Sequence, residues 1–134
     1  MKYFPIYLDA KHINAMIIGG GEVAARKIEL LLKSTTNISI ISETLNSSVE
    51  RLVNLHQLNW LKHNYQPGHL SKSNIVIAAT DSVEVNSAVA AESTQLKLLT
   101  NVVDQPELCT YITPAIIDRS PIIISMSSSG SAPI

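Results

Sequence analysis

The sequence predicts an α/β domain of the Rossmann type, a doubly wound, mostly parallel sheet with helices on both faces. Short apolar runs alternate with helical patterns along the chain, which is the order typical of βαβ units. The apolar runs are continuous, as in strands that are buried on both faces. The first of them, at 15–18, leads through three glycines directly into a helical pattern. Together these observations favour a parallel sheet over a sandwich or a bundle.

Each expected element has its own signal in the 134 residues, which are enough for one domain and too few for two. Apolar residues recur at helical spacing over 23–33. A second helix is expected over 83–93, capped by Asp81 or Ser82, with Asp81 preferred. Strands are expected at 15–18, 37–42, 60–64, 74–79, 98–103 and 121–125.

Composition excludes several classes of protein. The net charge of -1 leaves no basic surface for nucleic acid. No apolar run approaches the ~20 residues of a membrane span, and Lys2, Asp9 and Lys11 interrupt any signal-peptide core. The single cysteine, Cys109, cannot form an intramolecular disulfide and fits a reducing compartment. We therefore expect a cytoplasmic protein with neither a nucleic-acid nor a membrane partner.

The glycine loop has the pattern G-x-G-x-x-A between a strand and a helix, which is typical of dinucleotide-binding sites. Gly19 would allow the tight turn, Gly21 would leave room for a pyrophosphate, and Ala24 would let helix and strand pack closely. The backbone N–H groups and dipole of the helix start favour the anion. Glu22 is expected to face solvent and to favour the helix start. The alternative is a glycine turn without a ligand.

An acidic residue is expected about 20 residues after the glycine loop, where it would accept the ribose 2′-hydroxyl. Glu43 lies there, just after the second strand. No lysine or arginine follows before Arg51 to hold a 2′-phosphate, so the pattern favours NAD over NADP. The alternative is a solvated loop glutamate.

Two later strand ends offer further candidates. Asp104 follows a strand at the carboxyl edge, where ligands bind in open α/β sheets, and a carboxylate there can accept a proton. The alternative is a loop or capping aspartate. The backbone and hydroxyl of Thr80 could line the nucleotide cleft. Asn101 is predicted inside a strand, where a buried amide needs partners.

Arg119 has two possible roles. It either faces a substrate carboxylate or pairs with Asp118 at the surface.

The cysteine and the histidines indicate no metal site. Cys109 has no partner motif, and the histidines lack metal-ligand spacing. The histidines are His12, His56, His63 and His69.

Three segments together resemble one family. They read FPIYLDAKHINAMIIGGGEVAARKIELLL, IAATDSVEVN and NVVDQPELCTYITPAIIDRSPIIISMSSSGSAP. They are similar to the N-terminal module of sirohaem synthase, the precorrin-2 dehydrogenase/sirohydrochlorin ferrochelatase family. The resemblance covers essentially the whole chain, and NVVD followed by TPAIIDRSP is far more specific than the glycine loop.

The resemblance implies an NAD-dependent oxidation of precorrin-2 to sirohydrochlorin, and in many members the insertion of Fe²⁺, a substrate, to give sirohaem. Family members are homodimers, and a helical region after the nucleotide-binding domain completes the dimer and the tetrapyrrole cleft. On this basis residues 1–113 form the NAD-binding domain and 114–134 begin the dimerisation and substrate region. We expect the chain to be a fragment that stops inside this region; the alternative is an unusually short natural protein.

The resemblance also implies roles for single residues. Asp104 matches the catalytic aspartate. Ser128 matches a phosphorylatable serine, although SSSGSAP stands where a glycine pair is common. The expected NAD site comprises Gly19, Gly21, Glu22, Val23, Ala24, Glu43, Thr44 and Thr80. Two other functions fit the glycine loop, an NAD-sensing regulatory module without catalysis and a fragment of another dehydrogenase. Turnover of precorrin-2 separates the sensing module from the enzyme.

Overall fold

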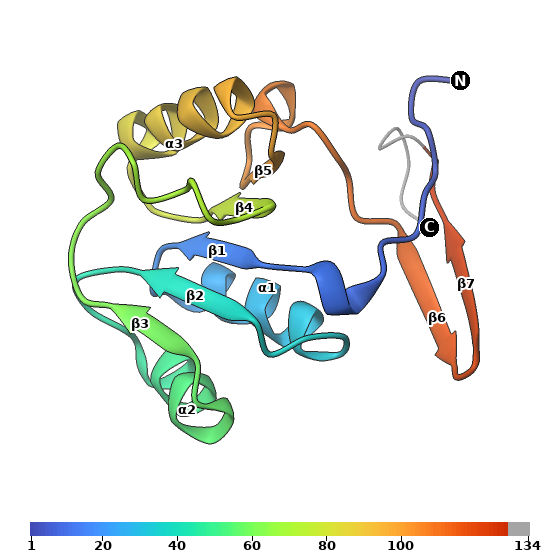
Figure 1. The fold of residues 1–134 in the computed structure, drawn as a ribbon, viewed down its shortest axis with the longest axis horizontal. Coiled ribbons are helices and arrows are strands. Elements are labelled where there is room, and N and C mark those ends of the chain that lie inside the picture. Colours follow the sequence, from blue (N-terminus) through green and yellow to red (C-terminus); the bar gives the residue numbers. More distant parts are fainter. Residues whose placement is uncertain (129–134) are drawn as a thin grey trace.

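A five-stranded parallel sheet forms the centre of the computed structural model, which describes residues 1–128 (Figure 1). The strands are β1 (Ala15–Ile18), β2 (Ile38–Ile41), β3 (Asn59–Leu61), β4 (Ile75–Ala78) and β5 (Leu99–Val102). Their spatial order is β3-β2-β1-β4-β5, which is the doubly wound order. The order reverses between β1 and β4, so the crevice expected in such folds lies at their carboxyl ends.

Helices cover both faces of this sheet and confirm the predicted fold class (Figure 1). The helices α1 (Glu22–Leu32) and α2 (Ser47–His56) pack on one face, and α3 (Val83–Gln95) packs on the other. Successive residues of β1 point to opposite faces: Ile17 belongs to the apolar cluster under α1 and α2, and Ile18 to the cluster under α3. This two-sided burial explains the continuous apolar runs. Within residues 1–128, no helix has the length and apolar character needed to cross a membrane.

The helix α2 was not predicted, although its signals are present. The Asn46 side chain accepts a hydrogen bond from the Val49 backbone N–H at 2.9 Å, which caps the helix start. Val49, Leu52 and Val53 are buried at helical spacing. The third strand was expected at 60–64 and is found at Asn59–Leu61, so it ends three residues earlier than predicted.

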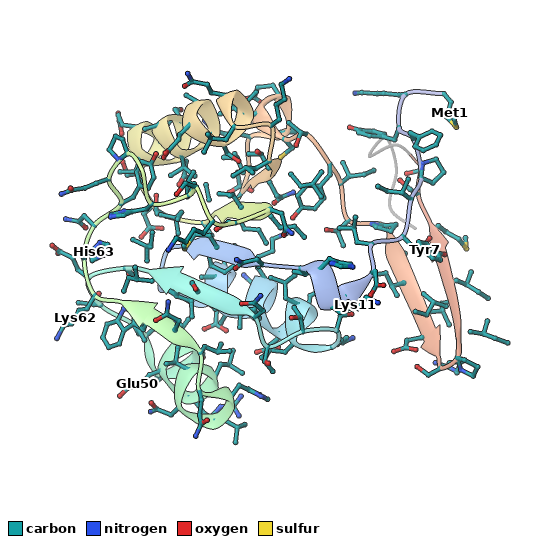
Figure 2. All side chains as sticks on the ribbon, in the orientation of Figure 1. Met1, Tyr7, Lys11, Glu50, Lys62 and His63 are labelled. Atoms are coloured by element: carbon teal, nitrogen blue, oxygen red, sulfur yellow. The ribbon has the colours of Figure 1, made fainter. Side chains whose placement is uncertain are left out.

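The last described elements form a separate antiparallel hairpin, β6 (Ala115–Arg119) and β7 (Ile122–Met126). Of its two strands only the second was predicted. Figure 1 shows the hairpin apart from the main sheet, beyond the start of β1 and beside the N-terminal segment. One contact between them joins Tyr7 Oη to Ser125 Oγ at 3.0 Å. Figure 2 labels Tyr7 on the N-terminal segment. Two short 3₁₀ helices, η1 (Ala10–His12) and η2 (Pro106–Leu108), complete the described chain.

Candidate functional site

Four loops meet at the carboxyl edge of the main sheet. Ile18, which ends β1, is in register with Ile41 of β2 and with Ala78 of β4, and Ala78 is in register with Val102 of β5. The strands therefore end level with one another. Most of the residues predicted for the site follow these ends, namely Glu43 and Thr44 after β2, Gly19 and Gly21 to Ala24 after β1, Thr80 after β4 and Asp104 after β5.

The first two glycines of the loop are required by close backbone contacts. Gly19 has φ +131°, and a Cβ added to it would lie 2.4 Å from the carbonyl oxygen of Ala79. A Cβ on Gly20 would lie 2.3 Å from the carbonyl oxygen of Thr44. The predicted role of Gly19 in a tight turn fits this geometry. The requirement at Gly20 was missed, because its neighbour Thr44 is distant in sequence.

The third glycine is open. A Cβ on Gly21 would meet no atom within 4 Å, and Gly21 precedes α1 without any side-chain cap. The N–H groups at the start of α1 are therefore left for an anion. Ala24 is fully buried one turn further on, as expected for a residue that lets helix and strand approach. Val23, which precedes Ala24 in the sequence, is half-buried.

Glu22 is exposed, as expected, and it also binds a neighbouring helix start. Its Oε2 accepts a hydrogen bond from Asn46 Nδ2 at 3.3 Å. The backbone N–H of Asn46 donates to the carbonyl of Gly20 at 2.8 Å. The carboxylate is thus directed toward α2, which explains how an acidic residue fits beside a site for an anion.

Glu43 lies exposed beyond the end of β2, and its Oε1 accepts a hydrogen bond from Asn64 Nδ2 at 2.9 Å. Thr44 is also exposed, and its carbonyl accepts a hydrogen bond from Ser42 Oγ at 2.6 Å. The structure adds a cation that reading along the sequence did not find. Lys62 directly follows β3, the neighbouring strand, and its Nζ lies 5.6 Å from the centre of the Trp60 ring (Figure 2).

Thr80 forms a closed hydrogen-bond network with Asn86. The Thr80 hydroxyl donates to Asn86 Oδ1 at 2.7 Å, and Asn86 Nδ2 donates to the Thr80 carbonyl at 3.1 Å. Asn86 is only 5% exposed, and sequence reasoning missed it. The Thr80 hydroxyl therefore shapes the loop after β4. The preferred cap of α3 was wrong: Ser82 Oγ, not Asp81, accepts from the Val85 N–H at 3.2 Å.

Asp104 stands exposed on a tight turn after β5. Its φ is +63°, a left-handed conformation that aspartate and asparagine adopt more readily than most residues. Hydrogen bonds hold both sides of the turn, from the Val103 N–H to the Ala78 carbonyl at 3.0 Å and from the Gln105 N–H to the Val102 carbonyl at 3.3 Å. The carboxylate has no hydrogen-bond partner among residues 1–128, so it is available to a ligand.

The other candidates lie elsewhere. Arg119 is in the hairpin, away from this edge, and donates to the Asp118 carbonyl at 3.0 Å and not to its carboxylate. Asn101 is half-buried in β5, not fully buried as expected. Ser128 is half-buried beyond β7, and the rest of the serine-rich turn lies outside the described residues. Within residues 1–128, no three histidine, cysteine, aspartate or glutamate residues are grouped to hold a metal.

Two tyrosine phenols of the domain have raised pKa values. Burial, and then the hydrogen bond to Glu92, raise the pKa of Tyr65. Burial, and then the nearby Cys109, raise the pKa of Tyr111. Tyr65 therefore stays protonated at neutral pH and donates to Glu92 Oε1, while Glu92 Oε2 accepts from the Gly68 N–H at 2.7 Å. These bonds fasten the long connection between β3 and β4 to α3.

The doubly wound sheet, the glycine loop at its centre and the uncapped helix start define a Rossmann-type dinucleotide-binding domain. A family model described as putative NAD(P)-binding matches residues 6–115, and the chain belongs to this family.

The comparisons with single proteins confirm the resemblance read from the sequence. The whole chain is 42% identical to a siroheme synthase of Pseudoalteromonas atlantica and covers 29% of that protein. It is 44% identical over 137 residues to a siroheme synthase of Nitrosomonas eutropha and covers 28% of it. The chain thus spans less than a third of the curated relatives that it matches. Among solved structures, SirC, a precorrin-2 dehydrogenase, superposes with a TM-score of 0.80 at 22% identity, over 98% of this chain and 64% of that one. This likeness shows the fold.

Proposed function

We propose that the chain is the dehydrogenase part of a sirohaem synthase and that it oxidises precorrin-2 to sirohydrochlorin with NAD⁺. The identity of 42% to a siroheme synthase along the whole chain carries this proposal. The geometry supports it, because the expected cofactor loop and the expected catalytic carboxylate lie on one edge of the sheet. A sirohaem synthase also inserts Fe²⁺, and we assign that metal to the substrates.

The residues at this edge fit the parts of NAD⁺. The open surface at Gly21 and the N–H groups at the start of α1 suit the pyrophosphate. Glu43, after the second strand, suits a ribose diol, since its carboxylate accepts hydroxyl hydrogens and repels a 2′-phosphate. Lys62, held over Trp60, is the cation that would compete with this preference. We therefore assign NAD⁺, and calorimetric titration of both nucleotides tests the assignment.

Bound NAD⁺ supplies the hydride acceptor of the reaction. Oxidation of precorrin-2 removes two hydrogens, one as a hydride to the nicotinamide and one as a proton. We assign Asp104 as the group that accepts the proton, because its carboxylate is exposed at the same edge and is free of partners among the described residues. In chelation the same carboxylate would take pyrrole protons as Fe²⁺ enters. The fold orients cofactor and substrate around this carboxylate.

The proposal extends to the division of the chain, its dimerisation and its location in the cell. Residues 1–113 carry the nucleotide site, and residues 114–134 begin a region that joins two copies into a homodimer. Exposed isoleucines on β6 and β7 support an interface there, since Ile116 of β6 is 47% exposed and Ile122 of β7 is 64% exposed. We place the protein in the cytoplasm and leave phosphorylation of Ser128 as an expectation.

The decisive experiment supplies precorrin-2 and NAD⁺ to the longest native protein that contains this chain and follows NADH. Formation of NADH with sirohydrochlorin is the expected result. A nucleotide-sensing module would bind NAD⁺ and oxidise nothing, so binding without turnover would overturn the enzymatic proposal. Absence of NAD⁺ binding would overturn the cofactor assignment as well.

A further inference from the structure

The strand β3 and the segment that follows it hold the segment after β2 through three contacts. The Trp60 indole Nε1 donates to the Ser42 carbonyl at 2.8 Å, and the Ser42 N–H donates to the Leu61 carbonyl at 3.3 Å. Beyond these, Asn64 Nδ2 donates to Glu43 Oε1 at 2.9 Å. The first two contacts place the backbone that carries Glu43, and the third acts on its carboxylate.

We propose that Asn64 is a positioning residue that sets the nucleotide selectivity of this site. The inference rests on the proposed assignment of Glu43 to the ribose. An exposed glutamate has several rotatable bonds and samples many rotamers, so a ligand that needs one of them must order the side chain. The amide of Asn64 holds the carboxylate in one direction before the nucleotide arrives.

Asn64 is itself presented from a fastened backbone. The preceding His63 is bonded on both sides, with its N–H donating to the Leu61 carbonyl at 2.9 Å and its Nδ1 3.0 Å from the Asn64 carbonyl oxygen. The following Tyr65 donates to Glu92 of α3. Figure 2 shows Lys62 and His63 at the end of β3, where this segment leaves the sheet. The donor that acts on Glu43 is therefore placed by contacts with both β3 and α3.

Selectivity follows from where the negative charge is held. A carboxylate fixed beside the ribose accepts the 2′-hydroxyl of NAD⁺ and repels the 2′-phosphate of NADP⁺. Without the Asn64 amide, the Glu43 side chain can rotate away from the ligand. NAD⁺ then loses a pre-ordered acceptor, and NADP⁺ loses part of the repulsion. The removal of one neutral amide should thus lower the affinity for NAD⁺ without lowering the affinity for NADP⁺.

The test measures NAD⁺ and NADP⁺ binding to the 134-residue chain by calorimetry in a double-mutant cycle of Asn64→Ala with Glu43→Ala. We expect Asn64→Ala to weaken NAD⁺ binding about 3- to 10-fold, as for the loss of one hydrogen bond. NADP⁺ binding should stay equal or become tighter. In the Glu43→Ala background, Asn64→Ala should have no further effect, because the group on which it acts is gone.

Asn59→Ala is the matched control. Asn59 is an exposed asparagine that begins β3, and its Nδ2 donates to Ser39 Oγ at 3.2 Å, away from the carboxyl edge. Its loss should change neither affinity. Asn64→Asp keeps the size of the side chain but removes the donor and adds a like charge, so it should weaken NAD⁺ binding at least as much as Asn64→Ala.

The outcomes separate this inference from the proposed function. Wild-type chain that binds neither nucleotide overturns the proposed function and the inference with it. A second outcome overturns the inference alone. In it the wild type binds the nucleotide and Glu43→Ala weakens this binding, but Asn64→Ala has the same affinities as Asn59→Ala. Additive losses in the double variant also overturn it, because Asn64 would then act without Glu43. Thermal melts of each variant ensure that the cycle compares folded proteins.

Discussion

Substitution of Gly21 by alanine should separate nucleotide binding from folding. A methyl group at Gly21 would meet nothing within 4 Å, and the backbone there has φ -100° and ψ -165°, which alanine adopts without strain. Alanine is a poorer helix cap than glycine by up to about 1 kcal/mol. Alanine also makes the unfolded chain less flexible, which stabilises the folded state by about 0.4–1 kcal/mol and offsets this loss. The free energy of unfolding should therefore change by less than about 1 kcal/mol.

Nucleotide affinity should fall much more. If the pyrophosphate rests on this open backbone, the methyl group fills space that the ligand needs. Forcing a methyl group into a close contact costs about 1–3 kcal/mol, which corresponds to about 5- to 150-fold in affinity. Gly20→Ala is the contrasting variant. Its Cβ would lie 2.3 Å from the Thr44 carbonyl oxygen, a backbone atom that cannot move alone. The free energy of unfolding of this variant should therefore fall by about 1–3 kcal/mol.

The assay combines urea unfolding with calorimetric titration of NAD⁺ for the wild type and both variants. Gly21→Ala should retain the unfolding midpoint and lose affinity, and Gly20→Ala should lose stability. Wild-type affinity in Gly21→Ala would refute the reasoning, because the pyrophosphate would then lie elsewhere. A large loss of stability in the same variant would show that this backbone is not open in the way described.

Three other predictions follow from single residues. In the longest native protein, Asp104→Asn should lower turnover of precorrin-2 by about 10²–10⁴-fold with NAD⁺ affinity nearly unchanged, and wild-type turnover would exclude the acid–base role. Asp104→Ala should also abolish oxidation, but the backbone φ of +63° at this position strains alanine by about 1–2 kcal/mol. Asp104→Gly is therefore the better variant for removing the side chain, and a thermal melt should confirm that each variant is folded. Asn86→Ala should destabilise the chain by about 1–3 kcal/mol, because the Thr80 backbone N–H and carbonyl lose their bonds to the Asn86 side chain; an unchanged urea midpoint would contradict this. NAD⁺ should bind more tightly than NADP⁺ in calorimetry, and equal affinities would remove the assigned role of Glu43.

The sheet could be predicted from the sequence because its signals are local. Four-residue runs such as 15–18 and 75–78 are buried on both faces, and a continuous apolar run reports this directly. The strand β3 has three residues and only partial burial, so its limits were misplaced. The helix α2 was overlooked although Asn46 and the stripe of Val49, Leu52 and Val53 mark it. The strand β6, Ala115–Arg119, was overlooked because its short apolar run is followed at once by the charged Asp118 and Arg119.

The candidate site was predictable only where one segment carries the whole motif. The glycine loop, Glu43 and Asp104 each lie at a strand end, and strand ends can be placed from the sequence. The residues that hold them in place, their supports, cannot be predicted in this way, because they come from other parts of the chain. Asn64 lies 21 residues from Glu43, and Asn46 lies 24 residues from Glu22. Each support is a polar side chain in a loop, where no periodic pattern distinguishes it from a solvated residue.

These supports join the proposed pyrophosphate loop and the proposed ribose loop into one unit. The backbone of Asn46 bonds to Gly20, its side chain bonds to Glu22, and Thr44 packs against the bare Cα of Gly20. The same β2–α2 connection carries Glu43, which Asn64 holds from the other side. The two loops therefore cannot shift independently, and the distance between a pyrophosphate on one and a ribose on the other is set before binding. Such pre-ordering lowers the entropic cost of binding, and it gives Gly20 a role, because its bare Cα lets the two loops approach each other.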